Sequence, residues 1–132
     1  MKKPYTLILF YFVIAIILSD CKNDNKKFEY IVDKKEVRLL LGNNYNHIKY
    51  NEIVPVKFLI KGIKLNQLRI FGPGISISSE NDSTLNGTIL VKQSYSKSFP
   101  NLIKNDTFHI KILIVEDQRK NNGEILVPLK KN

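Results

Sequence analysis

From residue 28 to the end of the chain, apolar residues alternate with polar ones or form short runs, and this is the pattern of β-strands. The clearest case is residues 107–116, where Phe108, Ile110, Ile112 and Ile114 recur at every second position and so share one face. Strand patterns also occur at residues 28–32, 36–41, 54–60, 68–71, 75–79, 88–96 and 124–129. No segment of this region keeps the spacing of an amphipathic helix, so we predict about eight strands and no helix.

Residues that favour turns separate the predicted strands. Pro73 fixes φ at the first central position of a turn, and Gly74 accepts a positive φ at the next. We therefore expect residues 68–71 and 75–79 to form a hairpin. Loops are predicted at residues 80–87, 97–106 and 117–123.

The predicted fold is all-β, a single antiparallel β-sandwich of immunoglobulin type with seven to eight strands. Residues 54–60 are the best candidate for a central strand, although Pro55 should lie at the start of that strand or at a sheet edge. The chain has one cysteine and no tryptophan, so it lacks the disulfide and the buried indole of antibody domains. Its core must consist of isoleucine, leucine, valine and phenylalanine.

The first twenty residues have a different pattern. Lys2 and Lys3 precede residues 5–18, which carry no charge and are almost entirely apolar. A basic start followed by a short apolar run is typical of a secretory signal peptide. As a helix, this run would be about 21 Å long, which is shorter than the roughly 30 Å hydrocarbon core that a spanning helix must cross.

The apolar run ends at Leu18-Ser19-Asp20-Cys21, which resembles the lipobox of bacterial lipoproteins. In that family a signal peptidase cuts before the cysteine, which receives a diacylglycerol on its thiol and usually an acyl chain on its new amino group. The resemblance implies cleavage between Asp20 and Cys21 and lipidation of Cys21. Asp20 stands where the family normally has glycine, alanine or serine, so an uncleaved single-pass anchor is the alternative.

These features divide the chain into a signal peptide at residues 1–20, a lipid-anchored polar tether at residues 21–27 and one folded domain at residues 28–132. An exported, membrane-anchored protein is expected, facing the periplasm or the cell surface. Lys22 follows the cysteine, whereas aspartate at that position favours inner-membrane retention in lipoproteins. The outer membrane is therefore the favoured location.

The formal net charge of the chain is +9, and cleavage before Cys21 would leave +8. Such a charge could attract nucleic acid or an anionic membrane surface. However, the charge is spread along the chain, and only three of the basic residues are arginines, which is few for a phosphate or base reader. We therefore predict no nucleic-acid partner.

Residues 49–130 weakly resemble the C-terminal β-sandwich modules of the gliding-motility and type IX secretion subunit M family. Three stretches carry the resemblance: "KYNEIVPVKFLIKGI", "LRIFGPGISIS" and "FHIKILIVEDQRKNNGEILVPLKK". They correspond to an alternating strand that ends in glycine, a short hairpin with a glycine-rich turn, and the closing hairpin. The resemblance implies an immunoglobulin-like fold and a role in protein contact in the cell envelope, and it carries over no catalytic residue.

The residue types that support catalysis or metal binding are few. His47 and His109 are the only histidines, and we expect His109 to face solvent because it alternates with core residues. No short-range His/Cys spacing or carboxylate cluster predicts a metal site, and no cofactor is expected. Tyr45, Tyr50 and Tyr95, with neighbouring lysines, could imitate a base-stacking surface, but we expect at least some of these rings to pack on the sandwich.

Asp82-Ser83-Thr84 resembles the short acceptor motif of O-glycosylation in gliding-type bacteria, with Ser83 as the acceptor. This gives the only predicted modification site besides Cys21.

Taken together, the sequence predicts a non-enzymatic cell-envelope lipoprotein that presents an immunoglobulin-like domain to an unidentified protein partner. A single-pass anchored protein is the first alternative. A small-ligand carrier or an enzyme accessory protein is the second, and it would need a pocket with convergent polar groups.

Overall fold

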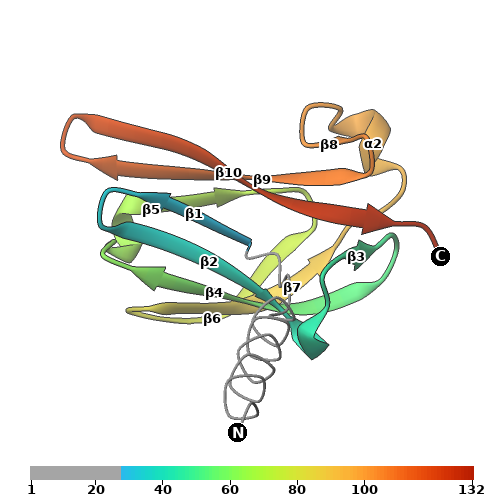
Figure 1. The fold of residues 1–132 in the computed structure, drawn as a ribbon, viewed down its shortest axis with the longest axis horizontal. Helices are drawn as coiled ribbons and strands as arrows, with labels where there is room; N and C mark the ends of the chain where they lie inside the picture. Colours follow the sequence, from blue (N-terminus) through green and yellow to red (C-terminus); the bar gives the residue numbers. More distant parts are fainter. Residues whose placement is uncertain (1–27) are drawn as a thin grey trace, which may run out of the picture.

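Two β-sheets pack face to face in the computed structural model, which describes residues 28–132 (Figure 1). The strands of the first sheet, in spatial order, are β1 (Phe28–Val32), β2 (Lys35–Leu41), β4 (Ile53–Lys61), β7 (Thr84–Leu90) and β6 (Ile75–Asn81). Those of the second are β3 (Ile48–Lys49), β10 (Arg119–Lys130), β9 (Thr107–Glu116) and β5 (Leu68–Phe71), and β8 (Ile103–Lys104) also pairs with β9. Every pairing is antiparallel except that of β3 with β10.

The strand order is that of an immunoglobulin constant-type sandwich. Lettered along the chain from β2, the seven longer strands after β1 give the order A-B-E-D in the first sheet and C-F-G in the second. β1 adds an edge strand beside β2, and the short β3 and β8 complete the second sheet. The predicted all-β sandwich is confirmed, with ten strands rather than seven or eight. The predicted signal helix lies outside the described residues.

Alternation along the strands builds the core. In β4, residues at even positions are buried and those at odd positions are exposed or half-buried, and β9 has the same alternation. Phe58 of β4 and Phe108 of β9 are the largest fully buried side chains. No polar or charged residue among residues 28–132 is buried, so the two sheets are held together chiefly by apolar contact.

The sequence predicts Pro55 at the start of its strand or at a sheet edge. Instead it is the third residue of β4, the middle strand of the first sheet. On one side, Pro55 pairs with Thr88 of β7. On the other side, the pairing of β4 with β2 covers Val56 but not Pro55, so no residue of β2 lies opposite the proline. The chain on the β2 side turns away at Gly42, whose Cα lies against the ring of Pro55. The missing N–H is therefore tolerated because β2 ends before it reaches the proline.

The predicted loop at residues 80–87 is too long, because only residues 82 and 83 form a turn, and the predicted strand at 88–96 is correct only for residues 88–90. β6 and β7 form a hairpin whose turn is Asp82 and Ser83, and β7 already ends at Leu90. The side-chain oxygen of Asn81 accepts a hydrogen bond from the Ser83 N–H at 3.0 Å, which stabilises the turn. After β7 the chain forms one helical turn, α2 (Tyr95–Ser98), where the sequence predicts no helix. Two short 3-10 turns occur earlier in the chain, η1 (Gly42–Asn44) after β2 and η2 (Leu65–Gln67) before β5.

The other predicted loops were also too long. β10 begins at Arg119, five residues before the predicted start of the last strand, so the polar residues 119–123 continue the hairpin with β9. Within residues 97–106, β8 turns tightly into β9 through Asn105 and Asp106, which both have positive φ. This is the conformation of a two-residue hairpin turn that asparagine and aspartate tolerate. At the Gly72-Pro73-Gly74 turn, the predicted positive φ of Gly74 is confirmed at 85°. The predicted hairpin of residues 68–71 and 75–79 is wrong, because the turn carries the chain from one sheet to the other: β5 pairs with β9, and β6 pairs with β7.

The ring of Tyr30 on β1 joins the two sheets by lying over Gly123 of β10. A Cβ atom at Gly123 would come within 2.0 Å of this ring. The Tyr30 hydroxyl also donates to the backbone oxygen of Asn122, at 3.3 Å. Glycine is thus required at position 123 by the close approach of an aromatic side chain from the other sheet.

Replacing Gly123 with alanine is expected to destabilise the domain by about 1–3 kcal/mol, because the added methyl group overpacks against Tyr30. Urea unfolding of the wild type, Gly123→Ala, Tyr30→Ala and the double variant measures this coupling. In the Tyr30→Ala background, the Gly123→Ala change should cost much less. Equal costs in both backgrounds would contradict the assigned contact.

Candidate functional site

The outer surface of the second sheet carries the most varied group of side chains. We call it the β9–β10 face, and its residues are Phe71, His109, Lys111, Leu113, Asn122, Glu124 and Leu126. The strand register places Lys111 between Phe71 of β5 and Glu124 of β10, and it places His109 beside Leu126. These residues point outward because they alternate with core residues on β9 and β10.

A lysine and a histidine converge on one carboxylate in this face. Glu124 Oε1 lies 2.5 Å from Lys111 Nζ, and Glu124 Oε2 lies 2.7 Å from His109 Nδ1. The hydrogen bond from Lys111, and then that from His109, lowers the pKa of Glu124 below its ordinary value. Residues that alternate along two strands thus form a polar network that fixes three side chains on an otherwise open surface.

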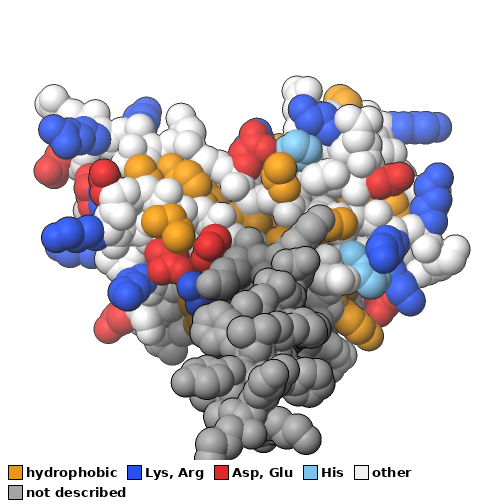
Figure 2. Space-filling view, in the orientation of Figure 1, with side chains coloured by type: hydrophobic (Ala, Val, Ile, Leu, Met, Phe, Trp, Pro, Cys, Tyr) orange, Lys and Arg blue, Asp and Glu red, His pale blue; other side chains and the backbone are white. Residues whose placement is uncertain are grey.

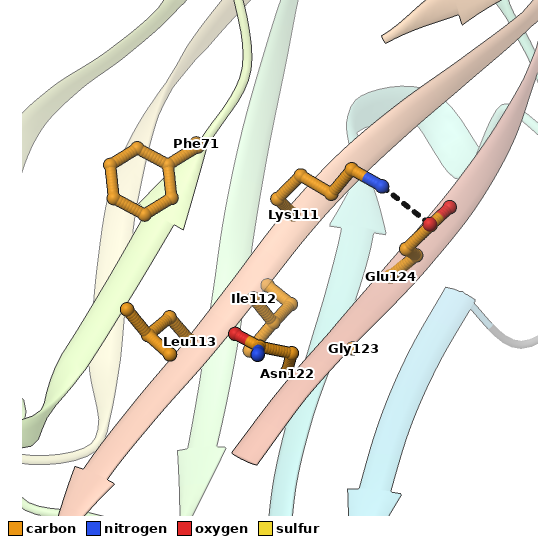
Figure 3. A pocket seen from close by; sticks show the side chains of 7 residues that line it. All are labelled: Phe71, Lys111, Ile112, Leu113, Asn122, Gly123 and Glu124. Atoms are coloured by element: carbon orange, nitrogen blue, oxygen red, sulfur yellow. Dashed lines mark hydrogen bonds and ion pairs between the residues drawn. The ribbon is translucent and has the colours of Figure 1, made fainter. Parts of the chain in front are cut away.

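A shallow groove of about 330 Å³ runs beside this network (Figure 3). Phe71 stands on β5 at one side, Leu113 lies on β9, and Lys111 with Glu124 closes the other side. Asn122 and the backbone of Gly123 complete the lining. The side chain of Phe71 is 50% exposed, so a large apolar surface is open to solvent next to charged hydrogen-bonding groups.

The groove and its surroundings combine apolar and charged side chains. Leu126 beside it is 51% exposed, so apolar side chains flank the charged network on two sides. Exposed aromatic and aliphatic side chains therefore lie next to hydrogen-bonded polar groups on this face. Within residues 28–132, no group of three or more His, Cys, Asp or Glu side chains is arranged to hold a metal ion.

Basic side chains are distributed unevenly over the molecule (Figure 2). Figure 2 shows lysine and arginine side chains gathered at both ends of the view, with hydrophobic side chains between them. At one end, Lys49 and Lys130 occupy paired positions of β3 and β10 beside His47. Partial burial of His47, and then these two lysines, lower its pKa despite Glu52 nearby.

The predicted modification sites lie in different places. Cys21 and Asp20 fall outside the described residues. Ser83 lies exposed at the tip of the β6–β7 hairpin, where its backbone oxygen accepts a hydrogen bond from Ile60 N–H at 2.8 Å. Its glycosylation stays a prediction.

The structure separates the histidines and tyrosines that the sequence singled out. His109 does point away from the core, but its side chain is only 15% exposed because it is held in the network with Glu124. Tyr50 is buried, and its hydroxyl donates to Asp106 at 3.2 Å. Tyr95 packs against the core and Tyr45 is exposed, so the three rings do not share one stacking surface.

Sequence reasoning missed Lys111, Glu124, Phe71 and Asn122 as site residues. The alternation of residues 107–116 places Lys111 on the outer side of its strand, so this residue could have been identified from the sequence. Asn122 was assigned to a loop, however, and the pairing of Glu124 with Lys111 depends on strand register. Register cannot be read from the pattern of a single strand.

A scan against protein-family models, a search of curated proteins and a search of solved structures each found no match to this chain. The search for membrane-spanning helices among residues 28–132 found none that is long and apolar enough.

The lowered pKa of Glu124 predicts a pH-dependent contribution to stability. Because folding lowers this pKa, the contribution is fully present above the unfolded value of about 4.5 and is lost as the pH falls through the folded value. Glu124→Gln should therefore lower the free energy of unfolding at pH 7, by less than about 1 kcal/mol because the pair is partly exposed.

Urea unfolding at pH 7 and pH 3 measures the effect, and the difference between wild type and variant should shrink at the lower pH. Glu80→Gln serves as the control, because Glu80 is exposed and forms no ion pair with residues 28–132. A Glu124→Gln penalty that is the same at both pH values would contradict the assigned network.

Proposed function

We propose that the protein is a non-enzymatic lipoprotein of the bacterial cell envelope whose immunoglobulin-like domain binds another protein. The observation that carries the proposal is the position of Cys21, which follows a short apolar run and precedes a polar segment and a folded β-domain. The outer membrane is the proposed location, with the domain facing the periplasm or the cell surface.

The physics of acylation supports the anchor. Each buried CH₂ group of an acyl chain contributes about 0.8 kcal/mol, and a single chain gives only reversible binding. The two or three chains of a mature lipoprotein make attachment effectively permanent. The basic charge that remains after cleavage would add attraction to anionic lipid headgroups.

The length of the tether restricts where the domain works. Seven residues, 21–27, connect the acylated cysteine to Phe28 at the start of β1. Fully extended, they span at most about 25 Å. The domain would therefore remain within this distance of the bilayer surface, and its partner must be membrane-bound or reach the membrane.

The β9–β10 face is the proposed contact surface because it combines exposed apolar groups with an oriented polar network. A ligand-carrier role is the second alternative. The groove beside Phe71 supports it less, because it is shallow and its volume is at the lower end of the range for small-molecule sites. An uncleaved single-pass anchor stays the first alternative, and it would keep the domain at the membrane in the same way.

The anchor is tested with Cys21→Ala in the native host. The variant should incorporate no labelled palmitate and should be released from membranes by washing with high salt. The intact mass of the wild-type protein should correspond to a chain that begins at Cys21 and carries acyl groups. A mass that includes residues 1–20 would establish the uncleaved anchor in place of the lipoprotein.

The contact surface is tested with a photo-cross-linking amino acid at Leu126, in cells. Leu40 provides a matched control, because it is also a half-exposed leucine but lies on the outer face of the other sheet. Cross-links to a protein should form from position 126 and much less from position 40. Cross-links from position 126 to lipid alone would contradict a protein-binding face.

A further inference from the structure

One lateral side of the sandwich is open. Between the edge strands β5 and β6 lies a groove of about 220 Å³, and most of the side chains that line it are apolar: Leu65, Leu68, Ile70, Ile75, Ile77 and Leu85. Ile77 pairs with Gly87, a residue on the buried face of β7, so its side chain points toward the layer between the sheets. It is nevertheless 41% exposed. Part of the apolar interior is therefore uncovered along this side.

The opposite lateral side is closed by contrast. Tyr30 of β1 packs on Gly123 of β10, and Lys35 of β2 forms an ion pair with Glu116 of β9. No comparable link between β5 and β6 exists among the hydrogen bonds and ion pairs of residues 28–132. The two sides of the sandwich thus differ in whether side chains bridge the sheets.

The edge of β6 lacks the usual protection against strand pairing. In the part of the chain that the structure describes, β6 pairs only with β7, so its other edge is unpaired (Figure 1). Natural edges are commonly blocked by lysine or proline, and residues 75–81 contain neither. Its protective features are a β-bulge between Ile77 and Ser79 and the acidic side chain of Glu80, which lines the groove. A basic side chain on an added strand would offset the charge of Glu80.

Charge sets this edge apart from the rest of the molecule. The chain has 21 lysine and arginine residues, yet none falls between residues 70 and 91, a segment that includes β6 and β7. The same segment contains two acidic residues, Glu80 and Asp82, and Glu80 lines the groove. A strongly basic protein therefore presents one acidic strand edge beside an apolar groove.

We propose that this edge binds an extended segment of a partner protein by strand addition. Ile77 and Glu80 both line the groove, so the segment carries apolar side chains and a lysine or arginine on the one face that it turns toward the groove. Main-chain hydrogen bonds to β6 would supply affinity, and apolar side chains would fill the groove beside Ile77. A basic side chain would pair with Glu80. The inference deepens the proposed role in protein contact and rests on that role, but it does not depend on the lipid anchor.

Electrostatics favours a foreign strand over a second copy of this chain. Two copies that joined through β6 would bring together two proteins of net charge +9, or +8 after cleavage, and two acidic edges. Both arrangements are repulsive at moderate ionic strength. A basic segment, by comparison, meets an edge of opposite charge.

The test uses the full chain in a non-ionic detergent and two labelled seven-residue peptides. Both have threonine at the even positions and valine at positions 1, 3 and 7, and position 5 is lysine in one peptide and glutamate in the other, so the charged residue shares a face with the valines. Fluorescence anisotropy should show binding of the lysine peptide at least about tenfold tighter than that of the glutamate peptide. Glu80→Lys should reverse this preference. Hydrogen exchange should slow in β6 when the lysine peptide binds.

A matched pair of variants locates the site. Ile77→Lys places a charge in the groove, whereas Ser76→Lys adds the same charge one residue earlier, on the outer face of the same strand. We expect the first to weaken binding of the lysine peptide by at least about tenfold and the second by less than about threefold. Because Glu80→Lys changes only an exposed side chain, it keeps the test decisive if Ile77→Lys fails to fold.

Several results would overturn the proposal. These are equal binding of both peptides, equal loss in the two lysine variants, or a stable dimer through β6 in sedimentation measurements of the wild type. If the wild-type protein is acylated at Cys21 but does not bind the lysine peptide, the strand-addition site is rejected and the proposed lipid anchor is supported. If the wild-type protein keeps residues 1–20 and still binds the lysine peptide, the lipoprotein proposal is rejected and the strand-addition site is supported.

Discussion

The contact between the inner faces of two β-sheets is the interaction on which the rest of this structure depends. The chain has a single cysteine, and no polar or charged residue between residues 28 and 132 is buried. The sheets are therefore held by apolar burial, chiefly of aliphatic side chains with Phe58 and Phe108 as the largest. Since burial of apolar surface is non-directional, the specificity of the arrangement must come from strand order, register and a few close contacts.

Two such contacts distinguish the lateral sides of the sandwich. On one side, Tyr30 fits against Gly123, and Lys35 pairs with Glu116, so side chains from both sheets meet. On the other, β5 and β6 diverge and leave Ile77 partly exposed above an apolar groove. The immunoglobulin-type sandwich thus has one closed and one open side, and the charge of the open edge is opposite to that of the whole protein.

The β9–β10 face follows from the same core. Because Ile110 and Ile112 are buried, His109 and Lys111 must point outward, and the β10 register brings Glu124 between them. The polar network is thus a consequence of strand pairing that the apolar residues enforce. It lies on the outer face of the second sheet and the open groove lies between the sheet edges, so the two surfaces are distinct. Contact at one does not require the other.

The sequence by itself determined the all-β class and the core positions of the long strands, because these depend on local patterns that one segment can carry. Alternation identified Phe108, Ile110, Ile112 and Ile114 as core residues, and all four are buried. It could not distinguish the polar half of a strand from a loop. Residues 119–123 and 84–87 therefore appeared as loops, although pairing with β9 and with β4 makes them strands. Only the tertiary structure decided that Glu124 meets Lys111 and His109, that Gly123 lies under Tyr30 and that β6 is an open edge. Each of these depends on register or sheet order, which arises when distant segments pack together and has no counterpart in the pattern of any single segment.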